Sequence, residues 1–193
     1  MHHHGSSHPS VLSALVIIRT RPEYERRSTI SSIALFTATI TGPREAAFDL
    51  LHARFDPAAS RADIIKGLCE RIPAGAQLLV RQPILPSRYL MGTAAVRDLP
   101  PIDNELIARG LPGTTLLPLT VSEEQLTMAG EGIGLQMAGP ESTPLKRNRR
   151  APEQAMALWS IYTQAFCRRP ESRALIASFQ AWRVLERAKP LPF

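Results

Sequence analysis

The sequence has few cysteines, few lysines and, beyond its first ten residues, a single histidine. Its two cysteines, Cys69 and Cys167, exclude a framework of several disulfides and favour a reducing cytoplasm. Together with His52 they are too few for a usual zinc site. No apolar run approaches the roughly 18 residues that a membrane-spanning helix needs. We therefore expect a cytoplasmic protein that holds no metal or other cofactor and does not enter a membrane.

The positive charge of the chain comes almost entirely from arginine. The net charge is +6, and Lys66, Lys146 and Lys189 are the only lysines. A basic surface of this kind favours polyanions, nucleic acid first. A high-GC genome, which enriches arginine, alanine and proline together, would produce the same composition. Both explanations stay open at this point.

Length and hydrophobicity indicate one globular domain with a sizeable core, because 193 residues are 44% apolar. Residues 1–10 are typical of a tag or a disordered leader, which we exclude from the fold. We expect the main domain over residues 11–170 and a C-terminal helical extension of the same domain over residues 171–193.

Apolar periodicity predicts strands first and helices later, which indicates an α/β protein. Val11–Thr20 is a continuous apolar run, typical of a strand buried on both faces. Further strands are expected at Thr29–Ile40, Ala46–Leu51 and Gln77–Val80. Helices are expected after Ser60 and over Ser87–Met91, Asn104–Arg109, Ser122–Ala129, Pro152–Phe166 and Glu171–Ala188, with a basic loop over Pro140–Arg150.

Three segments carry a resemblance to a known family. Leu15–Arg21 is an apolar strand that ends where the family has Asp-x-Glu. Leu78–Leu90 and Arg149–Ala157 match the spacing of its second and last motifs. The chain thus resembles the DnaQ-like (DEDDh) 3′–5′ exonucleases of the ribonuclease-H-like fold. The resemblance implies a central mixed five-stranded sheet that opens with a β-meander, is flanked by helices and is followed by an extra C-terminal helix.

The catalytic positions of that family hold other residues in this chain. In active members four carboxylates bind two divalent cations, and a histidine activates the attacking water. The matching positions here are Arg19, Arg21, Pro86, Arg149 and Gln154. Arginine stays protonated and neither coordinates a metal nor accepts a proton. The resemblance therefore implies a pseudoenzyme with no catalytic residues and no metal.

Nucleic-acid binding without hydrolysis is the first hypothesis, for single strands or 3′ ends. Guanidinium groups bind phosphate oxygens in pairs of hydrogen bonds, so arginines at a former metal site would keep the attraction for a strand. The expected binding residues are Arg19, Arg21, Arg81, Arg88, Lys146, Arg147, Arg149 and Arg150. The alternative is that these arginines have drifted and are solvated or paired with Glu23, Glu25 and Glu153.

A protein-interaction or scaffolding subunit is the second hypothesis. Its basis is an apolar stripe at helical spacing near the C-terminus, formed by Leu175, Phe179, Trp182 and Leu185. This stripe would bind a protein partner or a second copy, or it would pack on its own domain. An active 3′–5′ exonuclease ranks last.

Overall fold

A computed structural model describes residues 11–20, 29–42, 44–56, 58–82, 113–137 and 144–188. Arg21, Pro86 and Arg88 lie outside these residues, as do the helices expected at Ser87–Met91 and Asn104–Arg109. The structure therefore bears on the remaining predictions only.

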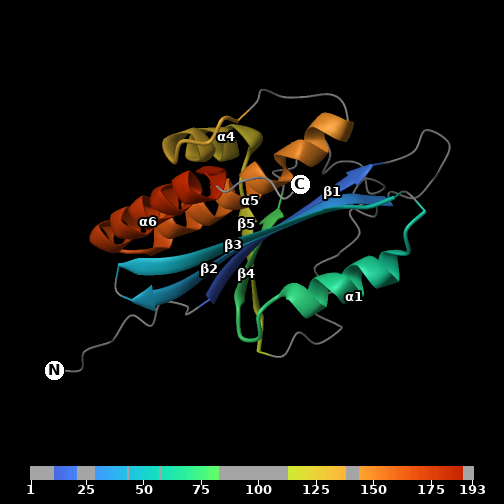
Figure 1. Cartoon of the computed structure of the whole chain (residues 1–193), viewed down its shortest axis with the longest axis horizontal. Coiled ribbons are helices and arrows are strands. Elements are labelled where there is room, and N and C mark those ends of the chain that lie inside the picture. The colour runs from blue at the N-terminus through green and yellow to red at the C-terminus, as the bar shows by residue number, and fades with distance from the viewer. Residues whose placement is uncertain are drawn as a thin grey trace, which may run out of the picture.

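The core of the fold is one five-stranded mixed sheet (Figure 1). Its strands lie in the order β3-β2-β1-β4-β5, in which β1, β2 and β3 are antiparallel neighbours and β4 and β5 run parallel to β1. The strands are β1 Val11–Thr20, β2 Thr29–Gly42, β3 Glu45–Arg54, β4 Gln77–Gln82 and β5 Thr115–Thr120. The α/β class, the mixed five-stranded sheet and the opening meander are thus confirmed.

Helices cover both faces of the sheet, which makes three layers (Figure 1). Among the described helices, α1 packs on one face, and α4, α5 and α6 pack on the other. These helices span Arg61–Arg71, Glu123–Gly132, Pro144–Phe166 and Arg169–Ala188 in that order. Within the described residues, no helix is long and apolar enough to cross a membrane.

Strand β1 is buried on both faces, as its continuous apolar run predicts. Ala14 and Val16 face the α5-side core, the buried cluster beneath α4, α5 and α6. Leu15 faces the α1-side core, the cluster that includes Ile65 and Leu68 of α1. Successive side chains of a strand point to opposite faces, so only an unbroken apolar run satisfies both cores.

Helix α6 belongs to the core of the domain. Its Phe179 and Trp182 join Phe36, Phe48 and Trp159 in one aromatic cluster, whose contacting rings have centroids 5.3–5.8 Å apart. Such stacked, tilted and edge-on pairs add to the stabilisation from burial.

Most of the C-terminal stripe packs on its own domain, which is one of the two alternatives that the sequence left open. Leu175 and Phe179 are buried and Trp182 is partly buried, because all three pack on their own sheet. Only Leu185, whose relative exposure is 66%, remains at the surface.

Two proline-containing segments differ from the sequence-based expectation. Strand β5 was not predicted, because Pro118 interrupts its apolar pattern; β5 lies at the edge of the sheet, where a missing N–H is tolerated. The basic loop expected up to Arg150 is wrong from Pro144 onward, since α5 begins there and continues through Pro152. Buried residues on both sides of Pro152, Ala151 and Ala155 among them, hold the helix together despite one missing backbone donor.

Candidate functional site

The carboxyl ends of three parallel strands, β1, β4 and β5, meet at one edge of the sheet. Helix α5 runs in the opposite direction to these strands. The hydroxyl of Tyr162, in the last turns of α5, donates to Oε1 of Gln77 at the start of β4, at 3.3 Å. The first half of α5, with Arg150 and Gln154, therefore extends toward the carboxyl edge of the sheet, where Figure 1 shows its first turns near the arrowhead of β1. We take this edge as the candidate site.

Arg19 lies at this edge but on the opposite face of the sheet from α5. Its cross-strand partner is Ile30, which is buried in the α1-side core, and residues directly opposite on antiparallel strands share a face. Ile18, one residue earlier, packs against the α5-side core. The structure therefore does not bring Arg19 and Gln154 together on one face, contrary to what the resemblance implied.

A bulge in β2 accompanies this arrangement. The register between β1 and β2 shifts between Ile18 and Arg19, which leaves Ser31 as the extra residue. The hydroxyl of Ser31 donates to the carbonyl oxygen of Ile18 at 3.1 Å and fixes the irregularity. Arg19 consequently stays in register with Ile30 beyond the bulge.

Arg81 has a structural partner, which argues against its expected role in phosphate binding. Its Nη1 lies 2.6 Å from Oε1 of Glu123, and its Nε donates to the carbonyl oxygen of Val121 at 3.3 Å. Ser122 and Gln125 form a capping box at the start of the same helix, α4. Arg81 thus ties the end of β4 to the start of α4, and the carboxylate offsets its charge.

Four basic residues lie in the first two turns of α5, at positions 146, 147, 149 and 150. Lys146, Arg147 and Arg149 are placed by their backbone, since the structure describes no side chain for them. Arg150 is partly buried, and its Nε is enclosed without a hydrogen-bond partner. These residues form the basic segment of α5, which lies toward the carboxyl edge of the sheet.

Glu153 and Gln154 follow Arg150 by three and four residues, so all three belong to neighbouring positions on the helix surface. Oε2 of Glu153 is also enclosed without a hydrogen-bond partner, and Gln154 is only 8% exposed. A guanidinium, a carboxylate and an amide can bind a polar or anionic group by hydrogen bonds. The sequence indicates Glu153 only as a possible ion-pair partner of the arginines and not as a site residue, although its spacing from Arg150 is visible in the sequence.

Among the residues that the structure describes, no three His, Cys, Asp or Glu side chains are grouped so that they could hold a metal ion. Of the positions that the resemblance matches to catalytic residues, Arg19 and Gln154 have described side chains, and neither is a carboxylate. The described part of the site can therefore bind and orient a ligand through Arg150, Glu153 and Gln154.

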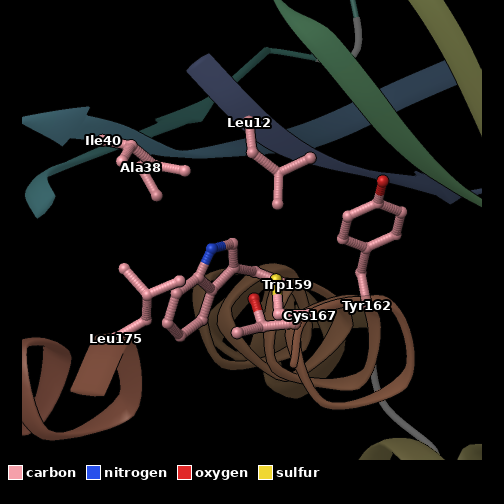
Figure 2. Close-up of a pocket in the computed structure, with 8 residues that line it drawn as sticks. Leu12, Ala38, Ile40, Trp159, Tyr162, Cys167 and Leu175 are labelled. Atoms are coloured by element: carbon pink, nitrogen blue, oxygen red, sulfur yellow. The ribbon is translucent and has the colours of Figure 1, made fainter. Parts of the chain in front are cut away.

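A small apolar pocket lies at the other end of α5, beside the start of β1 (Figure 2). Leu12, Trp159, Tyr162 and Cys167 are among its lining residues. Burial raises the pKa of the Cys167 thiol, and the nearby charge of Glu171 raises it further. A thiol held in its neutral form is a poor nucleophile, so we assign this pocket no chemistry. Sequence reasoning did not find it, because its residues come from four distant segments.

Comparison of the chain with models of protein families and with curated protein sequences found no match. The resemblance to the exonucleases therefore stays a prediction from the sequence.

Proposed function

We propose that the chain is a ribonuclease-H-like domain of exonuclease ancestry that binds single-stranded nucleic acid or a 3′ end without hydrolysing it. The observation that carries this proposal is the basic segment of α5, which lies toward the edge where the parallel strands β1, β4 and β5 end. Ligands of open α/β sheets bind outside the carboxyl ends of the strands.

The sheet supports the ancestry. A mixed five-stranded sheet that opens with an antiparallel meander is the arrangement that the resemblance implied. Gln154, at the position of the last catalytic Asp, lies on the helix that packs against β1. An amide there can donate to a phosphate or a base, whereas it is a poor replacement for a carboxylate that binds Mg²⁺.

The charge at the start of α5 supports a strand as the ligand. Lys146, Arg147, Arg149 and Arg150 supply four cationic groups within five positions. The amino-terminal end of a helix adds a positive partial charge that favours phosphate. We propose that the strand's phosphates lie along this segment, and that Arg150 and Gln154 contact the terminal nucleotide.

Hydrolysis requires a metal pair or a general base, and the matched positions provide neither. Arg19, Arg21 and Arg149 remain cationic, while Pro86 has no side-chain ligand. The proposal therefore keeps attraction for the strand and omits the step that activates water. Two of the arginines expected from the sequence to bind nucleic acid are not part of this proposal. Arg81 pairs with Glu123, and Arg19 lies on the face of the sheet opposite α5.

Fluorescence anisotropy with labelled single-stranded and double-stranded oligonucleotides, at two salt concentrations, tests this function. A triple variant Lys146→Glu, Arg147→Glu and Arg149→Glu changes the proposed site. Arg168→Glu, Arg169→Glu and Arg173→Glu make the matched control, since these exposed residues lie at the junction of α5 and α6 and give the same change in net charge.

Each phosphate contact contributes roughly a fivefold factor at 0.1 M salt, so losing three contacts should weaken binding about a hundredfold. The control triple should bind almost as the natural chain does. Equal losses in both triples would mean that net charge alone attracts the strand, and no binding at low salt would reject the function. Strand cleavage with Mg²⁺ or Mn²⁺ would reject the pseudoenzyme.

A scaffolding role is the second candidate. Burial of Leu175 and Phe179 removes most of its original basis, but Leu185 and the adjacent Val184 stay exposed. Recovery of a stable complex from the purified chain, lost when the exposed end of α6 is altered, would favour it.

A further inference from the structure

Three polar side chains in the second and third turns of α5 have hydrogen-bonding groups that the fold does not use. Nε of Arg150 and Oε2 of Glu153 are enclosed without a hydrogen-bond partner. Gln154 is 8% exposed, and no hydrogen bond joins its amide to another described residue. Buried polar groups normally find partners, because an unpaired one loses its hydration without compensation. A ligand that pairs with these groups would recover that free energy.

The three side chains occupy neighbouring positions on the helix. Glu153 and Gln154 follow Arg150 by three and four residues, and such spacings place Cβ atoms roughly 6 Å apart. Although their charges are opposite, Arg150 and Glu153 form no ion pair with each other. Their part of the site therefore presents a separate donor, a separate acceptor and an amide that supplies both.

The carboxylate of Glu153 decides which part of a nucleotide fits there. A phosphate carries negative charge and acceptor oxygens, so Glu153 would repel it, while a cation would be opposed by Arg150. A base carries no charge and has both donors and acceptors along its edge. In a single strand that edge is free to form hydrogen bonds with side chains. The chemistry of these three residues therefore favours a base.

We propose that Arg150, Glu153 and Gln154 bind a guanine base at the 3′ end of the strand, an inference that rests on the function proposed above. Among the four bases, guanine alone presents two adjacent donors, N1–H and the N2 amino group, and these match the two oxygens of one carboxylate. Its O6 accepts a hydrogen bond from Nε of Arg150 or from the amide of Gln154.

The other bases fit the carboxylate of Glu153 less well. Adenine and cytosine present one amino donor beside a ring nitrogen that accepts, and thymine and uracil present one donor between two carbonyl oxygens. Each of them therefore sets a lone pair against a carboxylate oxygen. Affinity and selectivity are thus divided along α5: its basic segment attracts the phosphates of any strand, and Glu153 selects the base.

Fluorescence anisotropy with labelled single strands that differ only in their 3′-terminal nucleotide tests this division. An oligothymidine that ends in deoxyguanosine should bind about tenfold or more tightly than the same strand ending in thymidine, because a two-bond contact to a base discriminates by this much. Strands ending in deoxyadenosine or deoxycytidine should resemble the thymidine strand. A strand ending in deoxyinosine lacks the N2 amino group and should bind with intermediate affinity.

Glu153→Gln separates a selective role from a structural one. Its amide sets a donor against the donors of guanine, so the preference for the guanine-ended strand should disappear. The thymidine-ended strand should bind at least as tightly as it binds the natural chain, because a negative charge is removed. Glu131→Gln is the matched control, since Glu131 is exposed near the end of α4 and the change in charge is the same. It should keep the preference for guanine.

The outcomes distinguish this inference from the function on which it rests. Equal binding of all five strands would overturn guanine recognition and leave nucleic-acid binding standing, whereas no binding of any strand at low salt would overturn both. Tightest binding of a strand that ends in deoxycytidine or deoxyadenosine would overturn the two-donor contact. An unchanged preference in Glu153→Gln, or equal weakening of every strand, would overturn the role of Glu153.

Discussion

Phe179→Ala tests whether α6 is part of the folding unit. Phe179 is fully buried, and its ring centroid lies 5.3 Å from Trp159, 5.6 Å from Phe36 and 5.7 Å from Phe48. The substitution removes one of the two α6 rings that contact the sheet, and Trp182 is the other. A helix that merely extended the domain would lose little, whereas a helix of the core would lose much.

The structure sets the expected magnitude. Truncating a fully buried phenylalanine removes its transfer free energy and leaves a cavity, which together cost about 3–5 kcal/mol. Domains are stable by about 5–15 kcal/mol, so the loss is a large fraction of the total. For a chain of this size the melting temperature should fall by roughly 6–20 °C.

Urea denaturation followed by tryptophan fluorescence is the suitable assay. The chain has two tryptophans, and both belong to the aromatic cluster around Phe179. Their emission therefore reports directly on the docking of α6. The midpoint should fall while the slope of the transition stays unchanged, as expected for a loss of stability without a change in the unfolded chain.

Gln180→Ala is the control, because Gln180 is exposed and next to Phe179. It should change the free energy of unfolding by less than about 0.5 kcal/mol. A loss below about 1 kcal/mol for Phe179→Ala would refute the packing of α6 against β2 and β3. A separate fluorescence transition at low urea would show that α6 unfolds independently.

Two further predictions concern the ion pair of Arg81 and the pKa of the Cys167 thiol. Arg81→Ala should lower the free energy of unfolding by about 1–2 kcal/mol, because it removes a partly exposed ion pair and a hydrogen bond to the carbonyl oxygen of Val121. Glu123→Gln should lower it by less, because the bond to Val121 remains. Equal losses for the two variants in urea denaturation would contradict a contribution from the bond to Val121. Burial and Glu171 raise the pKa of Cys167 above its ordinary value of 9.0, so the neutral thiol is favoured in the fold, and the associated stability is present at neutral pH and lost as pH rises through the raised pKa. In a Cys69→Ser background, alkylation of the native thiol should accelerate at higher pH than in the unfolded chain, and Glu171→Gln should lower that pH; identical pH profiles for the native and unfolded chains would show that the fold does not shift this pKa.

Much of the fold could be predicted from periodicity. The continuous apolar run at Val11–Thr20 and the alternation at Thr29–Ile40 correspond to β1 and β2 almost residue for residue. The helix expected over Ser122–Ala129 corresponds to α4, with Ser122 as its cap. Local patterns succeed there because each element buries a regular set of side chains.

Periodicity gave a wrong prediction at two prolines. Strand β5 was not predicted because Pro118 interrupts its apolar pattern. Pro152 predicted a helix start, whereas α5 begins at Pro144. In both, tertiary context decides: an edge strand has one side that needs no donor, and a helix held by buried neighbours survives one missing bond.

The sequence by itself determined the strands β1 to β4 and the order of the described helices, the basic charge, and the absence of carboxylates at Arg19, Arg21, Pro86, Arg149 and Gln154. Only the tertiary structure decided that Arg81 pairs with Glu123 and that α6 closes the core. It also placed Arg19 on the face away from Gln154. The physical reason is that side-chain chemistry is local, whereas partners and faces depend on register between strands far apart in the chain.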